Sequence, residues 1–308
     1  MIPVLSLEEF AQDRAGFAAT LGRTCRDTGF FLLKGHGVPT SLIDDVFAKG
    51  KAFFDQPDAD KNALAIAKIG NNRGYAALGT ERLDETSALS DRKEAFNIGL
   101  DLSPEDPRIQ RGEPFRGVNA WPDVDGFRET LLDYFDAVWA LGVTLHRPLA
   151  LDLGLPEHWF APHLDAPMAT LRLLSYPGDT AEATQTGAGA HTDYGSLTLL
   201  MTDGVPGLQV RTKAGDWIDV PHVDGAFVVN IGDCLMRWSN DTYVSTPHRV
   251  LPPPRARMSI AFFLDPNPDA MIEALPGTGA ARYGPVTAAE YLAERLNATY
   301  GPKNRKLH

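Results

Sequence analysis

The chain has 308 residues, with 29 lysines and arginines against 40 aspartates and glutamates, so its formal net charge is −11. Nucleic-acid binding rests on clustered positive charge, and we therefore expect no nucleic-acid partner. The two cysteines, Cys25 and Cys234, exclude a disulfide framework and predict reduced thiols. No run of 18 apolar residues and no secretory leader is visible, so we expect a cytoplasmic protein without a membrane partner.

Helical patterns occupy the first half of the chain and its end. Apolar residues between Leu7 and Cys25 recur at helical spacing, and Gly29 ends this predicted helix. Pro39 opens a second helix that continues to Phe54. A third is expected after Asp125 as its N-cap, and Pro148 should kink or end it. The last helical pattern covers Ala288–Leu296.

Short apolar runs separated by turn residues predict β-strands, mostly after residue 169. Their spacing is typical of an antiparallel sandwich or barrel. Gly187–Ala190 is expected to be a loop. The predicted strands are Phe30–Leu33, Thr170–Tyr176, Ser196–Thr202, Leu208–Arg211, Trp217–Val220, Phe227–Ile231, Tyr243–Ser245 and Met258–Leu264. We expect one domain over residues 1–308, with a mainly helical N-terminal layer (1–165), a β core (166–268) and a C-terminal helical segment (269–308).

Three His-x-Asp triplets raise the question of a metal site, although about one such triplet is expected by chance. The triplets beginning at His163 and His222 lie beside prolines or glycine and are interpreted as turn residues. His191 and Asp193 lead into an apolar β-run, and residues two apart on a strand project to the same face. This triplet therefore predicts two ligands from one strand.

A third ligand is available downstream in His248. Two imidazoles and one carboxylate on one side of an ion form the facial triad of non-haem Fe(II) oxygenases, which leaves positions open for substrate and O₂. Taken one at a time, a loop histidine, a turn aspartate and a core histidine would each be unremarkable. Arg257 and Ser259 shift the balance, because both would point into an apolar interior, where a guanidinium requires an anion. That pair suits one end of a dicarboxylate.

The order of these motifs resembles a known family. H-T-D at 191–193, H-R-V at 248–250 and R-M-S at 257–259 are similar to the iron- and 2-oxoglutarate-dependent dioxygenases of the isopenicillin N synthase-like family. Further similar stretches are G-F-F-L-L-K-G-H-G-V-P at 29–39, R-G-Y at 73–75, G-L-Q-V at 207–210, V-V-N-I-G-D at 228–233 and S-N-D-T-Y at 239–243. They cover most of the chain in family order.

The resemblance implies a mixed α/β fold with an all-β core, a double-stranded β-helix (jelly-roll) flanked by helices. It implies that His191, Asp193 and His248 bind Fe(II). It also implies that Arg257 and Ser259 hold the distal carboxylate of 2-oxoglutarate, with Tyr176 contacting this cosubstrate. The implied reaction is oxidation, by default hydroxylation, of a C–H bond in a small molecule, with O₂ consumed and succinate and CO₂ released.

Three other residues are candidates for substrate or cosubstrate contacts. Arg172 shares a strand face with Leu174 and Tyr176, and this face is equally compatible with an inward or an outward orientation. Leu174 stands where plant members of the family carry an Asn that contacts the cosubstrate. Arg73 and Tyr75 could face the mouth of the site, although a turn explains them as simply.

The motifs leave other activities open. An oxidase or cyclase resembling isopenicillin N synthase would use the R-x-S pair for its substrate and need no 2-oxoglutarate. Ethylene formation from 2-oxoglutarate is a further outcome seen in the family. A non-catalytic β-barrel that binds a metal or small ligand has no need of the cosubstrate anchor. The primary substrate and the oligomeric state are not predicted.

Overall fold

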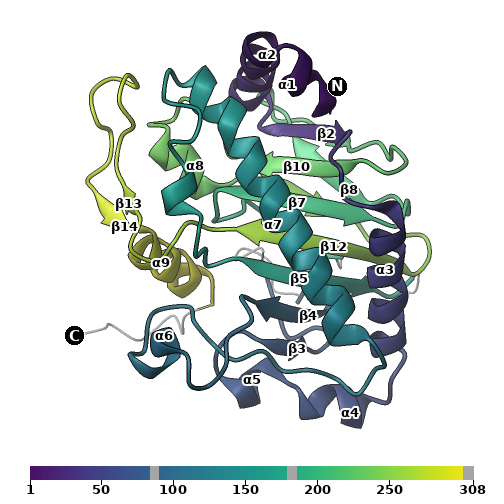
Figure 1. Cartoon of the computed structure of the whole chain (residues 1–308). Helices are drawn as coiled ribbons and strands as arrows, with labels where there is room; N and C mark the ends of the chain where they lie inside the picture. The colour runs from purple at the N-terminus through teal and green to yellow at the C-terminus, as the bar shows by residue number, and fades with distance from the viewer. Residues whose placement is uncertain (84–89, 179–185, 301–308) are drawn as a thin grey trace.

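The computed structural model describes residues 1–83, 90–178 and 186–300, and these residues build two facing β-sheets with helices outside them (Figure 1). The larger sheet has the strand order β1-β2-β10-β7-β12-β5-β4-β3, and the smaller has the order β6-β11-β8-β9. All these pairings are antiparallel except that of β1 with β2. Buried side chains from both sheets, among them Leu174, Ala261, Leu208 and Val250, form one apolar cluster between them.

The strands are β1 Val4–Ser6, β2 Phe30–Lys34, β3 Gly74–Ala76, β4 Glu94–Gly99, β5 Thr170–Tyr176, β6 Ala188–His191, β7 Leu197–Thr202, β8 Leu208–Arg211, β9 Trp217–Asp219, β10 Phe227–Ile231, β11 His248–Val250, β12 Arg257–Leu264, β13 Met271–Ile272 and β14 Val286–Thr287. The helices are α1 Glu8–Gln12, α2 Arg14–Asp27, α3 Thr40–Phe54, α4 Asp58–Ala63, α5 Ile66–Ile69, α6 Pro107–Gln110, α7 Phe127–Asp152, the 3₁₀ helix Ala161–His163, α8 Asp233–Trp238 and α9 Ala288–Tyr300.

Helix α7 covers the outer face of the large sheet, with α3 beside it (Figure 1). Its buried stripe includes Leu131, Phe135, Val138 and Leu145, which recur at three- and four-residue intervals as an amphipathic helix requires. The same face of the sheet is therefore closed to ligands, and only its inner face can line a site.

Several predicted elements differ from the structure in the helical part. The Leu7–Cys25 pattern forms two helices rather than one, because Asp13 leaves the helical conformation and its side chain accepts a hydrogen bond from Gly16 N (2.9 Å). Gly126 rather than Asp125 is the N-cap of α7. Pro148 does not end α7, which continues to Asp152.

Two predictions of β structure are also wrong. Tyr243–Ser245 is not a strand, since the Tyr243 hydroxyl reaches Asp152 Oδ2 (2.8 Å) and anchors an irregular segment to α7. Gly187–Ala190 is not wholly a loop, because β6 begins at Ala188 and pairs with β11. The N-terminal half also contributes β3 and β4, which the sequence did not predict, to the edge of the large sheet. Among the described residues no helix is long and apolar enough to cross a membrane.

Candidate active site

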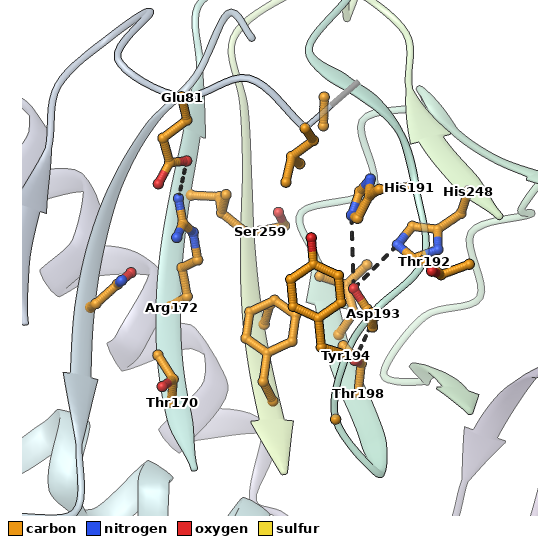
Figure 2. Close-up of a pocket in the computed structure, with 18 of the residues that line it drawn as sticks. Glu81, Thr170, Arg172, His191, Thr192, Asp193, Tyr194, Thr198, His248 and Ser259 are labelled. Carbon is orange, nitrogen blue, oxygen red and sulfur yellow. Dashed lines mark hydrogen bonds and ion pairs between the residues drawn. The ribbon is translucent and has the colours of Figure 1, made fainter. Parts of the chain in front are cut away.

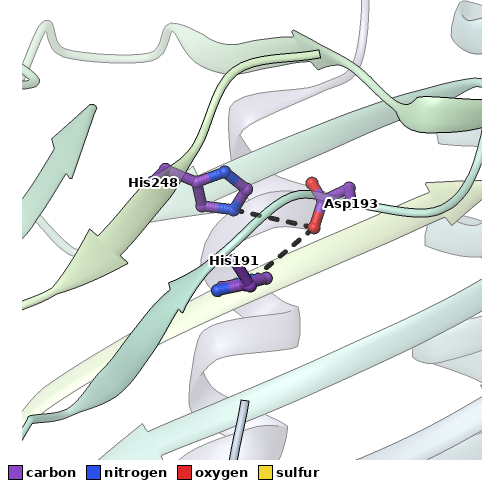
Figure 3. A group of neighbouring side chains, drawn as sticks. All are labelled: His191, Asp193 and His248. Carbon is purple, nitrogen blue, oxygen red and sulfur yellow. Dashed lines mark ion pairs between the residues drawn. The ribbon is translucent and has the colours of Figure 1, made fainter. Parts of the chain in front are cut away.

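His191, Asp193 and His248 meet at one point between the two sheets (Figure 3). Asp193 Oδ1 lies 3.7 Å from His191 Nε2 and 3.6 Å from His248 Nε2. The three candidate ligand atoms all lie within 4.8 Å of one another, and no other group of His, Cys, Asp and Glu among the described residues meets this condition. Two nitrogens and one carboxylate oxygen at this spacing fit a single Fe(II) bound on one side.

Strand pairing brings the two histidines together. His191 ends β6 and is the direct register partner of His248 at the start of β11. Asp193 is not on the same strand, as the sequence predicted, but in the connection between β6 and β7. The triplet therefore provides one ligand from the end of a strand and a second from the connection that follows it.

Backbone carbonyls orient both imidazole rings. Nδ1 of His191 lies 2.7 Å from Gly189 O, and Nδ1 of His248 lies 3.2 Å from Thr246 O. A carbonyl only accepts, so each Nδ1 carries the proton and each Nε2 is left with a lone pair. This is the tautomer that a metal-binding histidine needs.

The Asp193 carboxylate is fixed by two donors on its other oxygen. Thr198 Oγ1 donates to Asp193 Oδ2 at 2.6 Å, and Asn230 Nδ2 donates to the same oxygen at 2.8 Å. Burial raises the pKa of Asp193, but His248, His191 and these two donors outweigh burial and leave that pKa below its usual value. Burial and the neighbouring His248 lower the pKa of His191 to about 4. Around neutral pH the site thus offers a carboxylate and a neutral imidazole.

Arg257 and Ser259 line the same cavity from β12. Arg257 is 2% exposed, its Nε donates to Val205 O (3.2 Å) and one terminal nitrogen lies 3.3 Å from Ser259 Oγ. Its guanidinium also lies over the Tyr176 ring, 4.9 Å from the centroid. No carboxylate of the described residues pairs with the Arg257 guanidinium, and a buried cation is costly without an anionic partner.

Arg172 faces inward, which settles the orientation that the sequence left open. It lines the cavity, and its guanidinium pairs with Glu81, which also lies 3.4 Å from Lys93 Nζ. Burial opposes ionisation of Glu81, yet these two cations lower its pKa to about 2. Figure 2 shows this pair on the opposite side of the pocket from His191 and His248. The cavity volume is about 210 Å³.

Of the remaining candidates, only Arg73 lines the cavity. Arg73 lines the cavity and donates to the carbonyls of Asn72 and Phe115, each at 3.3 Å. Tyr75 is not among the lining residues, because its hydroxyl donates to Glu94 Oε2 (2.6 Å) and its ring packs on Phe53. His163 packs against Trp159 and Trp238, and the exposed His222 lies 2.9 Å from Asp224, so neither joins the triad.

Sequence reasoning missed several polar residues of the cavity, among them Glu81, Thr198, Asn230 and Asp265. Thr198 and Asn230 lie on the predicted strands β7 and β10. Side chains alternate between the two faces of a strand, and this alternation could have indicated that both residues face the cavity. Glu81 precedes a segment without a strand or helix pattern, so no sequence signal indicated its role. Asp265 follows β12 and continues the face of Arg257 and Ser259.

Comparisons with known proteins agree with this geometry. A family model described as 2OG-Fe(II) oxygenase superfamily, where 2OG is 2-oxoglutarate, matches residues 167–266. A second, described as non-haem dioxygenase in morphine synthesis N-terminal, matches residues 2–124. A curated relative from Emericella nidulans, the 2-oxoglutarate-Fe(II) type oxidoreductase hxnY, is 36% identical, with 97% of this chain and 90% of the relative covered. The chain therefore belongs to the 2OG-Fe(II) oxygenase superfamily.

Two further relatives illustrate the range of the family. A homoarginine-6-hydroxylase from Oryza sativa subsp. japonica is 35% identical, with 90% of this chain and 87% of the relative covered. A full-length Neurospora crassa protein, crystallised with alpha-KG and thymine, is 33% identical with a TM-score of 0.87, and 97% of each chain is covered. The predicted double-stranded β-helix class is confirmed. The chain is an Fe(II)- and 2-oxoglutarate-dependent oxidoreductase that uses O₂.

Proposed function

We propose that the protein hydroxylates a C–H bond of a small organic molecule, with His191, Asp193 and His248 as its iron ligands. The observation that carries this proposal is the set of three ligand atoms within 4.8 Å, which opens into the cavity lined by Arg257. When bound, Fe(II) with 2-oxoglutarate and O₂ supplies the oxidant. The protein supplies fixed ligands, because Gly189 O, Thr246 O, Thr198 and Asn230 orient all three.

Arg257, Ser259 and Tyr176 are proposed to hold 2-oxoglutarate. A planar guanidinium beside a hydroxyl matches a carboxylate in two hydrogen bonds. The Tyr176 ring under Arg257 limits the directions that the guanidinium can take. Leu174, which is 7% exposed, occupies the position of the family Asn, so the middle of the cosubstrate faces an apolar side chain.

The side of the cavity around Arg172, Glu81 and Arg73 is proposed to receive the primary substrate. A small molecule fits the cavity volume of about 210 Å³. The thymine in the Neurospora crassa relative supports a substrate of this size. Since Glu81 already neutralises Arg172, this pair offers a hydrogen-bonding surface rather than a free cation.

We also propose that residues 1–308 form a single catalytic domain that works in the cytoplasm. Strands from the first hundred residues and from the later core share one sheet, which supports the single domain. Both cysteines are free and buried, which fits a reducing compartment.

The decisive experiment measures 2-oxoglutarate turnover with Fe(II) and ascorbate while candidate substrates are screened. We expect succinate in a one-to-one ratio with a product that is heavier by one oxygen atom. Product formation without succinate would replace this proposal by the 2-oxoglutarate-independent oxidase. Ethylene would indicate the third activity that the motifs allow.

The variant Arg172→Ala separates the two ends of the cavity. If Arg172 serves the substrate, its loss should spare basal decarboxylation of 2-oxoglutarate and uncouple it from product formation. A rise in the KM for 2-oxoglutarate in this variant would instead assign Arg172 to the cosubstrate.

A further inference from the structure

Asp265 ends the row of inward-facing residues that begins with Arg257. Positions 257, 259, 261, 263 and 265 all line the cavity, as the two-residue period of a strand requires. Arg257 and Asp265 are therefore at opposite ends of one strand face, roughly 26 Å apart at about 3.3 Å per residue. The proposed cosubstrate occupies the Arg257 end, which leaves the Asp265 end for another ligand.

The metal ligands lie beside Asp265. A Cβ atom on Gly195, two residues after Asp193, would come within 3.0 Å of Asp265 Oδ1. On β7, Thr198 donates to Asp193 and is the register partner of Phe263 on β12. A group bound by Asp265 would thus lie on the side of the cavity that holds the metal ligands, where the bond to be oxidised must be held.

The Asp265 carboxylate is buried without a cation. Asp265 is 7% exposed. Among the described residues, no Lys, Arg or His lies within ion-pair distance of its carboxylate, and no donor forms a hydrogen bond to its oxygens. Burial, followed by repulsion from Asp193, raises the pKa of Asp265 to about 7. Isolated buried carboxylates are costly, and native proteins retain them where a ligand supplies the missing partner.

Resting on the proposed function, we infer that Asp265 binds a basic nitrogen of the primary substrate, an ammonium or guanidinium group on a compact apolar body. Elsewhere along the cavity two other cations are already paired, Arg172 with Glu81 and Lys93 with Asp91. The two terminal nitrogens of Arg73 donate hydrogen bonds to two backbone carbonyls. Asp265 is therefore the carboxylate that lines the cavity, is not a metal ligand and has no cationic partner among the described residues.

The neighbouring surface defines the rest of the ligand. Phe263 and Met168 line the cavity beside Asp265, and Leu292 and Leu296 line it from α9. These apolar side chains suit a hydrocarbon chain or ring that carries the nitrogen. A carboxylate in the same place would meet Asp265 as a like charge, so acidic substrates are disfavoured.

The test measures dissociation constants by calorimetry under argon, with the protein loaded with Fe(II) and 2-oxoglutarate. The probes are two apolar bodies, benzyl and pentyl, each carrying an amine, an alcohol or a carboxylate. The two amines should bind at least about 10-fold more tightly than the matched alcohols and carboxylates, since a charge-assisted hydrogen bond contributes about 1.5–3 kcal/mol. The comparison within the wild-type protein requires no variant.

Asp265→Asn should weaken amine binding by roughly 10- to 150-fold and leave alcohol binding nearly unchanged. The matched control is Asp269→Asn, the same chemical change four residues later on an exposed side chain, which should alter none of these constants. Cooperative thermal unfolding confirms that each variant is folded.

The inference is overturned if no amine binds, if a carboxylate binds most tightly, or if Asp265→Asn leaves amine binding unchanged. These results differ from a failure of the proposed function, which the same titrations report separately. If the wild-type protein with Fe(II) does not bind 2-oxoglutarate, the proposed function fails. If it binds 2-oxoglutarate but does not prefer amines, only the assignment of Asp265 fails.

Discussion

The contrast between Arg257 and Arg172 shows how a single side chain acquires its role. Both guanidiniums come from inner faces of neighbouring strands and line one cavity. Arg172 has a carboxylate partner in Glu81, whereas Arg257 has only a carbonyl, a hydroxyl and an aromatic ring. We therefore propose that a bound ligand supplies the anion that pairs with Arg257.

Replacing Arg257 should therefore affect the cosubstrate first. Arg257→Ala removes a charge-assisted interaction of about 1.5–3 kcal/mol, which should raise the KM for 2-oxoglutarate roughly 10- to 150-fold. Steady-state succinate formation at varied 2-oxoglutarate checks this. Arg257→Lys should recover part of the loss, and Ser259→Ala should cost less than Arg257→Ala. An unchanged KM in Arg257→Ala would favour the oxidase that needs no 2-oxoglutarate.

The donors on Asp193 should control metal affinity without contacting the metal. Thr198→Val keeps the shape of the side chain but removes the hydrogen bond to Asp193 Oδ2. Fe(II) affinity should fall about 10- to 100-fold, the usual cost of losing such a supporting partner. Thr202→Val on the same strand is the control. Equal Fe(II) affinities for the two variants would show that Asp193 needs no such support.

At the scale of elements, periodicity predicted the helices and strands that bury a face. The positions of α7, β5, β7, β10 and β12 follow from their apolar patterns. The positions of Arg257, Ser259 and Arg172 on inner faces follow from the two-residue period. The same logic brought His191 and Asp193 close together, although Asp193 lies in the connection after β6.

Elements set by long-range contacts were not predictable. β6 contains Gly189 between two alanines and forms because it pairs with β11, about 60 residues later. β3 is a short edge strand that pairs with β4, and β4 pairs with β5, which lies beyond α7 in the chain. The ion pair of Arg172 was not predictable either, because its partner Glu81 is 91 residues away in the chain.

His146 on α7 provides a test of how the helix is joined to the sheet. It is 1% exposed, its Nε2 lies 2.7 Å from Ser196 Oγ, and burial lowers its pKa to about 4 although the bond to Gly142 opposes this. The unfolded chain, with a pKa near 6.5, takes up a proton at a higher pH than the folded protein. Stability contributed by neutral His146 is therefore complete above pH 6.5 and is lost as the pH falls toward 4.

Between pH 7 and pH 5 this linkage should cost the wild-type protein about 2 kcal/mol more than His146→Gln, whose amide does not titrate. Urea unfolding at both pH values measures the difference. Parallel losses in the two proteins would mean that the pKa of His146 is not lowered in the folded protein.

At the scale of the whole molecule, the core does not depend on the metal. The main apolar cluster lies between the large sheet and its helices, whereas the triad lies on the other side of that sheet, on the smaller sheet and the connection after β6. The metal-free protein should therefore unfold cooperatively, with Fe(II) adding only the linkage term RT ln(1 + [Fe]/Kd). Calorimetric scans with and without a chelator measure this. A metal-free protein without a cooperative transition would indicate a structural metal.

The most direct test of the site is the stoichiometry of Fe(II) binding, measured by equilibrium dialysis under argon. The wild-type protein should bind one Fe(II) per chain. His191→Ala, Asp193→Ala and His248→Ala should each lose it, whereas His222→Ala and Arg257→Ala should retain it. Retention of iron by the three triad variants, together with its loss in His222→Ala, would contradict the assignment.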